Sequence, residues 1–202
     1  MAIIGVSRLY CAKYNNNNGA ISYSDGGLMA KITKVNISVE AGSDNDFYAD
    51  NAIDETDAGF AGGDYSVTPA DLTQQASKLI LGIQAQELTG ANAIDGVTDE
   101  GAEELIYDDR QNTPFLGIGN IIKVMRGGAI KWRAVVLTKV KFNVPADAAE
   151  TQGKTISWQT NDLAGKIFRD DTEYHSWKKE ATFSTEAQAE AYVRARLNIA
   201  AA

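Results

Sequence analysis

The chain has 202 residues, 44% of them hydrophobic and 23% charged, which is an ordinary composition for one globular domain. Its formal net charge of −8 argues against a protein that grips nucleic acid through its phosphates. With one cysteine, Cys11, and one histidine, His175, the chain forms no intrachain disulfide and is a poor candidate for a zinc site. We expect a single mainly β domain over residues 1–202.

The first part of the chain predicts antiparallel strands joined by tight turns. Residues 8–14 and 20–23 flank the polar loop 15–19, Asn-Asn-Asn-Asn-Gly, whose residues accept left-handed backbone geometry. Residues 30–41 alternate apolar and polar side chains, as a half-buried strand does. Cys11 is expected to be a small buried thiol.

Residues 42–63 predict a long ordered loop. The segment is rich in acids and glycines, but it keeps large aromatic residues that a disordered linker would lack. Loops of this length inside a compact domain are usually functional. We expect contacts with neighbouring copies here, the alternative being that the aromatic rings pack on their own sheet. The expected contact residues are Asp44, Phe47, Tyr48, Asp50, Asn51 and Phe60.

A helix is predicted after a short strand at residues 64–67. Thr68 can cap it and Pro69 suits the first helical position. Apolar residues recur over 72–83 at three- and four-residue spacing, which indicates a face packed on the sheet. Gly82 is the expected terminator.

Residues 84–110 predict an exposed excursion, with a short strand at 105–107. Charge is segregated around it, because residues 35–109 hold one basic residue, Lys78, among many carboxylates, whereas residues 111–146 hold no acid. Such segments suit head-to-tail packing between copies, and they suit neutralisation within one chain equally well.

The longest predicted element is a β-hairpin over residues 118–144. Two runs rich in β-branched residues flank Arg126-Gly127-Gly128, and a glycine pair tolerates the positive φ angles of a primed two-residue turn. A strand of about fifteen residues rises roughly 50 Å, so we expect the far end of the hairpin to pair with a neighbouring chain. The pattern therefore predicts an assembly protein.

Alternation after this turn separates an apolar face from a basic face. We expect the basic face and Arg126 to contribute assembly contacts. The apolar face comprises Ile130, Trp132, Ala134, Val136, Val140, Phe142 and Val144, and the basic face Lys131, Arg133, Lys139 and Lys141, interrupted by Val135 and Leu137.

The last part of the chain predicts two more strands and a closing helix. Residues 155–160 and 163–169 are the expected strands. The helix covers residues 185–199, where Thr185 and Gln188 have the spacing of a capping box. The predicted fold is thus mainly β, with one flanking helix and one C-terminal helix.

No catalytic, cofactor-binding or metal-binding constellation stands out. His175 is expected to be an exposed turn histidine, because no nucleophile elbow or orienting group accompanies it. Asp44-Asn45-Asp46 lacks the glycine and the closing glutamate of a calcium loop. Gly117-Ile118-Gly119 lacks the third glycine of a dinucleotide fingerprint. We therefore expect no enzymatic activity, no cofactor and no metal.

No stretch reaches the roughly eighteen apolar residues of a membrane span. The first six residues have no basic region and too short an apolar run for a secretory signal. We expect no membrane association, and a chain that is made in a cytoplasm and stays there until it assembles.

Three groups of segments are distinctive when they are taken together. They are Ile-Gly-Val-Ser-Arg-Leu-Tyr-Cys-Ala-Lys-Tyr at 4–14 with Ser-Tyr-Ser-Asp-Gly-Gly at 22–27, Asp-Asn-Asp-Phe-Tyr-Ala-Asp-Asn at 44–51 with Phe-Ala-Gly-Gly at 60–63, and Gln-Gly-Lys-Thr-Ile-Ser-Trp-Gln-Thr at 152–160. Together they resemble major tail proteins of long-tailed, non-contractile bacteriophages of Gram-positive hosts. The resemblance covers most of the chain and departs most over residues 82–105.

The resemblance implies a tail tube subunit made in the host bacterial cytoplasm, with two packed antiparallel sheets in a β-sandwich or barrel-like fold. Six copies would close a ring, and stacked rings would form a hollow virion tail that conducts the genomic DNA without binding it. Its partners would be further copies and the tape measure, terminator and distal tail proteins. With −8 on each chain, we expect a negative lumen that repels DNA phosphates.

Two alternatives remain at this point. One is the inner tube of a contractile tail, a bacteriocin or a secretion system, which shares the fold. The other is a carbohydrate-binding β-sandwich with Trp132, Trp158 and Trp177 as a sugar platform. Trp132 and Trp158 lie on apolar strand faces, which favours the core for them.

Overall fold

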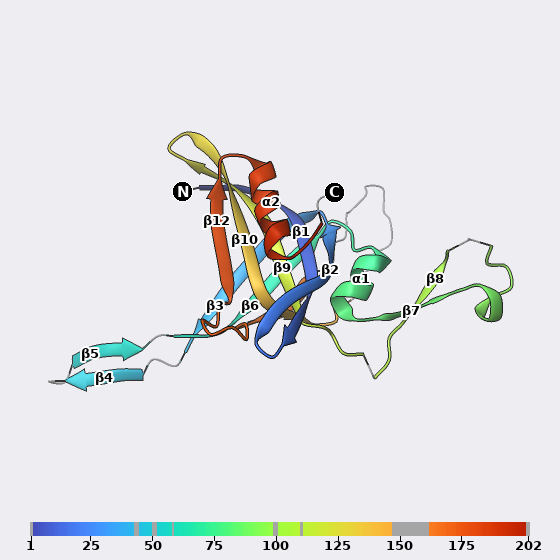
Figure 1. Cartoon of the computed structure of the whole chain (residues 1–202), viewed down its shortest axis with the longest axis horizontal. Coiled ribbons are helices and arrows are strands. Elements are labelled where there is room, and N and C mark those ends of the chain that lie inside the picture. Colours follow the sequence, from blue (N-terminus) through green and yellow to red (C-terminus); the bar gives the residue numbers. More distant parts are fainter. Residues whose placement is uncertain are drawn as a thin grey trace, which may run out of the picture.

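The structure is a computed structural model that describes residues 2–42, 45–49, 52–57, 59–98, 101–109, 111–146 and 162–200. Over these residues the fold is mainly β, with two α-helices (Figure 1). The elements are β1 (Ala2–Asn17), β2 (Ala20–Ala30), β3 (Ile32–Ala41), β4 (Asn45–Ala49), β5 (Ala52–Asp57), β6 (Phe60–Pro69), α1 (Gln74–Leu81), β7 (Gln84–Glu87), the 3₁₀ turn η1 (Gly90–Asn92), β8 (Glu103–Ile106), β9 (Leu116–Arg126), β10 (Ala129–Phe142), β11 (Leu163–Phe168), β12 (Lys178–Phe183) and α2 (Glu186–Arg196).

An eight-stranded antiparallel sheet forms the body. Its strand order is β2-β1-β9-β10-β11-β6-β3, and β12 pairs with β10 as well. β3 also contacts β1, so the sheet curls back towards its own first strand and encloses a core between two layers. The predicted β-sandwich or barrel-like fold, with a flanking helix and a C-terminal helix, is confirmed.

The long hairpin is present as predicted. Arg126 pairs with Ala129 across a two-residue turn, and Gly127 and Gly128 have φ angles of 58° and 77°. Both angles are positive, as a type I′ turn requires, and glycine adopts them without a steric penalty from a Cβ atom.

Most of this hairpin has partner strands within its own chain, and only its far end, residues 129–131, lacks one on the second edge of β10 among the described residues. One edge of β10 pairs with β9. The other edge is covered within the chain, by β12 from Trp132 to Leu137 and by β11 from Lys139 to Phe142. β10 is therefore a central strand and not an exposed edge.

The expectation of one continuous apolar face on β10 is also wrong. A register shift between Leu137 and Val140 marks a β-bulge, which changes the side of the sheet that later residues face. Trp132 and Val136 pack with α2, whereas Val140 packs in the core between the layers. By alternation, Lys139 and Lys141 therefore lie on the opposite side of the sheet from Lys131 and Arg133.

Two hydrophobic cores lie on the two sides of the sheet. The larger one, between the layers, includes the buried Cys11, Tyr65 and Phe142 and is closed by α1 through Ile80. Burial raises the pKa of the Cys11 thiol, and the predicted buried cysteine is confirmed.

The second core lies under α2, which crosses the outer face of β1, β9 and β10 (Figure 1). Val193 of the helix and Leu197, the residue that caps its C-terminus, pack there with Tyr10 and Ile121. A Cβ atom on Gly119 would lie 2.3 Å from Val193 Cγ1, so glycine at this position permits the close approach of helix and sheet.

Helix α2 begins at the predicted cap, because Thr185 Oγ1 accepts a hydrogen bond of 3.4 Å from the N–H of Gln188. The predicted start of the first helix at Thr68 is wrong. Thr68 and Pro69 end β6, where they pair with β3, and α1 is capped by Thr73. Gly82 ends α1 with a left-handed φ of 65°, as predicted.

Two short hairpins form separate two-stranded sheets. The segment predicted as a long loop contains β4 paired with β5, and the predicted excursion contains β7 paired with β8. Figure 1 shows the two hairpins extending from opposite sides of the body. The strand predicted at residues 155–160 lies outside the described residues.

Candidate assembly surfaces

The predicted contact residues do not form one surface. They fall on the β4–β5 arm (residues 45–57), on the β9–β10 tip (residues 123–131) and on the two sides of the main sheet. A further candidate surface is the β7–β8 arm (residues 84–109), which the sequence predicts to be exposed and which belongs to the acidic segment suited to packing between copies, although no contact residue is predicted there.

The β4–β5 arm joins the body through a narrow base. The N–H of Gly42 donates to the carbonyl of Gly59 at 2.6 Å, which brings the two ends of the arm together. Phe47 and Tyr48 lie in β4, at a register shift opposite β5. Three other predicted contact residues, Asp44, Asp50 and Asn51, lie outside the described residues.

Phe60 packs on its own chain. Its ring stacks on Trp177 at a centroid distance of 4.6 Å and an interplanar angle of 5°. The Arg169 guanidinium lies 5.8 Å from the same ring and donates to the carbonyl of Phe60. For Phe60, therefore, the alternative given above is correct: its aromatic ring packs on its own chain.

Lys139 and Lys141 have intrachain partners as well. Lys139 Nζ lies 2.8 Å from Asp171 Oδ2 and 4.8 Å from the ring centre of Phe115. Lys141 Nζ donates to Asn112 Oδ1 at 3.3 Å. Both lysines thus hold neighbouring segments of their own chain against β10. Their charged groups are therefore poorly placed to contact another copy.

Asp171 connects β10 to the first strand. Its Oδ2 accepts from Lys139 and from the hydroxyl of Tyr14, at 2.8 and 2.7 Å. These two hydrogen bonds lower the pKa of Asp171, while burial raises the pKa of Tyr14 to about 12. In the following turn His175 is exposed, with a φ of 47°, as the sequence predicts.

The β9–β10 tip is basic and partly apolar. Arg126 is exposed and has no hydrogen-bond or ion-pair partner among the described residues. Lys131 Nζ donates to Ser184 Oγ at 3.1 Å, and Lys123 Nζ lies 5.4 Å from the ring centre of Trp132. Next to the tip, on the same face as Lys131, Arg133 is half-buried. Its Nε is buried without a hydrogen-bond partner in the described part of the chain.

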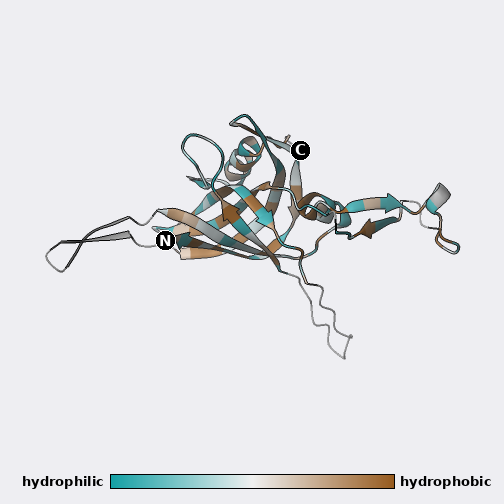
Figure 2. Ribbon diagram, turned by 90° about the horizontal axis from the view of Figure 1, so that it is seen from below, coloured by the Kyte–Doolittle hydropathy of each residue, from teal (hydrophilic) through white to brown (hydrophobic). Residues whose placement is uncertain are grey.

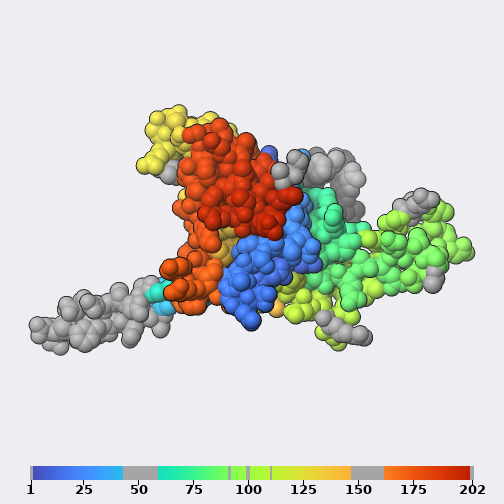
Figure 3. All heavy atoms as spheres, in the orientation of Figure 1, coloured from blue at the N-terminus to red at the C-terminus, as the bar shows by residue number. Residues whose placement is uncertain are grey.

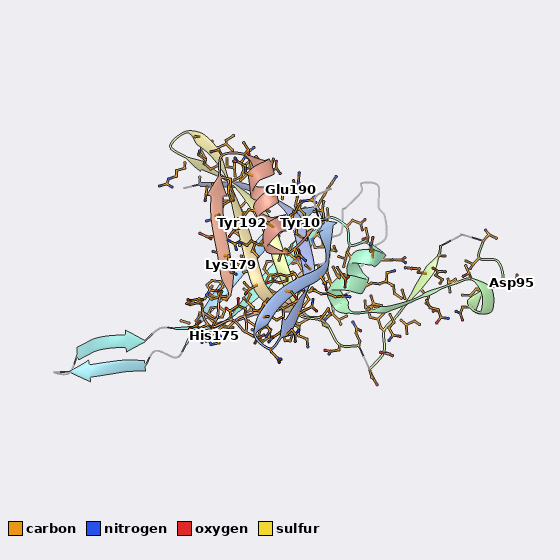
Figure 4. The ribbon with its side chains drawn as sticks, in the orientation of Figure 1. Tyr10, Asp95, His175, Lys179, Glu190 and Tyr192 are labelled. Atoms are coloured by element: carbon orange, nitrogen blue, oxygen red, sulfur yellow. The ribbon has the colours of Figure 1, made fainter. Side chains whose placement is uncertain are left out.

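The β7–β8 arm is acidic and is attached to α1 at its base. Lys78 Nζ lies 2.6 Å from Glu103 Oε2, and Leu105 packs against the larger core. Asp95 lies near the end of the arm (Figure 4). Asp95 and Glu104 are both exposed and have no ion-pair partner within the described ranges.

A cluster missed by sequence reasoning connects α2 to β1. The hydroxyl of Tyr10 donates to Glu190 Oε1 at 2.7 Å, and Arg194 Nη2 donates to the same oxygen at 2.8 Å (Figure 4). Arg8, with a φ of 61° at a register shift in β1, contacts the other oxygen. The hydrogen bond from Tyr10, aided by those from Arg194 and Arg8, lowers the pKa of Glu190. The i,i+4 spacing of Glu190 and Arg194 is the only part of this cluster visible in the sequence.

The Glu190 cluster predicts a pH-dependent stability. A carboxyl with a lowered pKa stabilises the fold above its unfolded pKa, about 4.3 for glutamate, and this contribution is lost as the pH falls through the folded pKa. We expect Glu190→Gln to cost about 1 kcal/mol of unfolding free energy at pH 7. The cost should shrink towards zero in acid. Urea unfolding from pH 7 to pH 3 measures this, with the exposed Glu173→Gln as the control. A cost that is constant with pH would contradict the assignment.

Two surface pockets offer no evident reaction chemistry. One, of about 410 Å³, lies between β2, α2 and the turn at Asp170. The buried Asp170 carboxylate there accepts from the N–H and the hydroxyl of Thr172, as in a turn cap. The other, of about 450 Å³, includes the Lys13–Asp25 ion pair and Met29. Among the described residues, no three His, Cys, Asp or Glu side chains converge as metal ligands would.

A comparison with models of known protein families found no match, and neither did a comparison with curated proteins. In the described part of the chain, neither helix is long and apolar enough to cross a membrane.

Proposed function

We propose that this chain is a structural subunit that assembles into stacked rings and forms a hollow tube. The observation that carries the proposal is the pair of two-stranded arms on opposite sides of a body that has its own cores (Figure 1). A two-stranded hairpin alone is marginally stable in water. Packing against a neighbouring copy would stabilise both arms.

The sequence resemblance supports a more specific form of the proposal. The chain would be the tail tube subunit of a long-tailed, non-contractile bacteriophage, with six copies in each ring. The genome would pass through the lumen, and the net charge of −8 per chain fits a conduit that repels phosphates. An inner tube of a contractile system would use the same subunit design, and a neighbouring sheath gene would identify it.

The packing of the tryptophans does not favour a sugar-binding platform. Trp177 stacks on Phe60, and Trp132 packs in the core under α2. Trp158 lies outside the described residues.

Negative-stain electron microscopy of the purified chain, with light scattering on the same samples, tests the proposal. We expect rings or hollow tubes of uniform width and a mass that rises in steps with protein concentration. A chain that remains monomeric at its highest soluble concentration, with and without a crowding agent, would overturn the proposal.

A further inference from the structure

The β7–β8 arm and the β9–β10 tip both expose apolar side chains. On the arm, Ile94 is 52% exposed and Tyr107 is 55% exposed. On the tip, Met125 and Ile130 are 43% and 45% exposed, and they are cross-strand neighbours in register. Figure 2 shows apolar residues along the arm where it extends from the body. Apolar side chains grouped on projecting elements are typical of protein–protein contacts.

The two surfaces carry opposite charge. The sequence of the arm, residues 84–109, contains acids at several positions and no Lys, Arg or His, whereas the tip, residues 123–131, contains Lys123, Arg126 and Lys131 and no acid. Opposite charge steers association and fixes which surfaces meet, while the apolar side chains supply contact area.

One chain cannot bring these surfaces together in this fold. The tip projects from the top of the body and the arm from its right side, so the two surfaces lie well apart, as Figures 1 and 3 show. Each has local anchors in its own chain, the arm through Lys78–Glu103 and the tip through Lys131–Ser184. Their complementarity can therefore be used only between copies.

We propose that the β7–β8 arm of one copy docks on the β9–β10 tip of the next copy, head to tail. This proposal rests on the proposed function and names the surfaces that would carry it. A head-to-tail contact leaves one free arm and one free tip on each pair, so it propagates. It closes into a ring when the rotation per copy allows closure, and otherwise it extends as a filament.

Charge reversal with mixing tests the docking. The tip variant, Arg126→Glu with Lys131→Glu, changes the charge of residues 123–131 from +3 to −1. The arm variant carries Glu87→Lys, Asp95→Lys, Asp99→Lys, Glu104→Lys and Asp109→Lys, which change the charge of residues 84–109 from −8 to +2. In either variant alone, arm and tip carry the same sign, and we expect at least a tenfold loss of assembly by light scattering. In an equal mixture every tip can meet an arm of opposite charge, so assembly should return. Lys31→Glu with Lys34→Glu, on and beside β3, is the matched control and should assemble as the wild type does.

Cysteine cross-linking provides a second measurement that does not depend on charge. Cys11 is fully buried, so a Tyr107→Cys, Ile130→Cys chain has two accessible thiols. We expect mild oxidation of the assembled protein to give a ladder of disulfide-linked copies. The control pair, Tyr174→Cys with Ile130→Cys, uses a turn residue that is even more exposed than Tyr107 and should give no ladder.

The results separate the two proposals. If the wild type forms tubes, but both charge variants also form them and the arm–tip cysteines do not cross-link, the docking is overturned and the tube function stands. If the wild type forms no assembly and the cysteines do not cross-link, both proposals fail. Recovery of assembly in the mixture, together with the cross-linked ladder, establishes the docking.

Discussion

Replacing residues 43–58 with an Asn-Gly turn is expected to give a folded monomer that no longer assembles. The carbonyl of Gly59 already accepts from the N–H of Gly42 at 2.6 Å, so a two-residue turn can connect the two ends. β4 and β5 pair with each other in a sheet of their own, and their removal leaves both cores of the body in place. Calorimetry should give a melting temperature within a few degrees of the wild type, while electron microscopy should show no rings or tubes.

Phe60→Ala is the matched control for this shortened chain, because Phe60 lies just beyond the arm and stacks on Trp177. We expect it to lower the unfolding free energy by about 1–3 kcal/mol and to leave assembly intact. If the shortened chain forms normal tubes, the β4–β5 arm is not required for assembly.

Phe142→Ala is expected to lower the unfolding free energy more than any other single substitution proposed for this protein. Its side chain is 1% exposed, and its ring lies 5.8 Å from that of Tyr65 in the core between the layers. Truncating a buried phenylalanine leaves a cavity and typically costs about 3–5 kcal/mol. This is a large share of the roughly 5–15 kcal/mol that holds a domain folded. Urea unfolding followed by tryptophan fluorescence measures the loss.

Phe168→Ala is the control for that measurement. Its ring is 39% exposed and touches Phe115 edge to face, so we expect a cost of about 1 kcal/mol. Equal costs for the two variants would show that Phe142 does not occupy the tightly packed position described above.

The β-bulge in β10 limits what the sequence can say about the basic residues. Val136 and Val140 occupy equivalent places in the alternating pattern, but they face different cores. A bulge is a property of the pairing between β9 and β10, so alternation along one strand cannot reveal it. The sequence therefore groups Lys131, Arg133, Lys139 and Lys141 on one face, and the structure divides them between two.

Strand pairing also decided the role of the long hairpin. Its length is readable from the sequence, but the strands that cover its second edge, β11 and β12, come from segments much later in the chain. The Glu190 cluster is likewise non-local, because Arg8 and Tyr10 meet Glu190 across nearly the whole sequence. Contacts of this kind depend on the complete topology and leave no local pattern.

The sequence by itself determined the features whose physical causes are local. The Gly127–Gly128 turn, the Thr185 cap, the Gly82 terminator and the buried Cys11 follow from backbone sterics, a nearby hydrogen bond or a short apolar alternation. Tertiary structure alone decided that β4 and β5, residues 45–49 and 52–57, form an arm and that β10 is a central strand of the sheet. It also decided that the acidic arm and the basic tip point away from each other. These outcomes depend on which distant strands pair, and the free energy of that pairing is spread over the whole sheet.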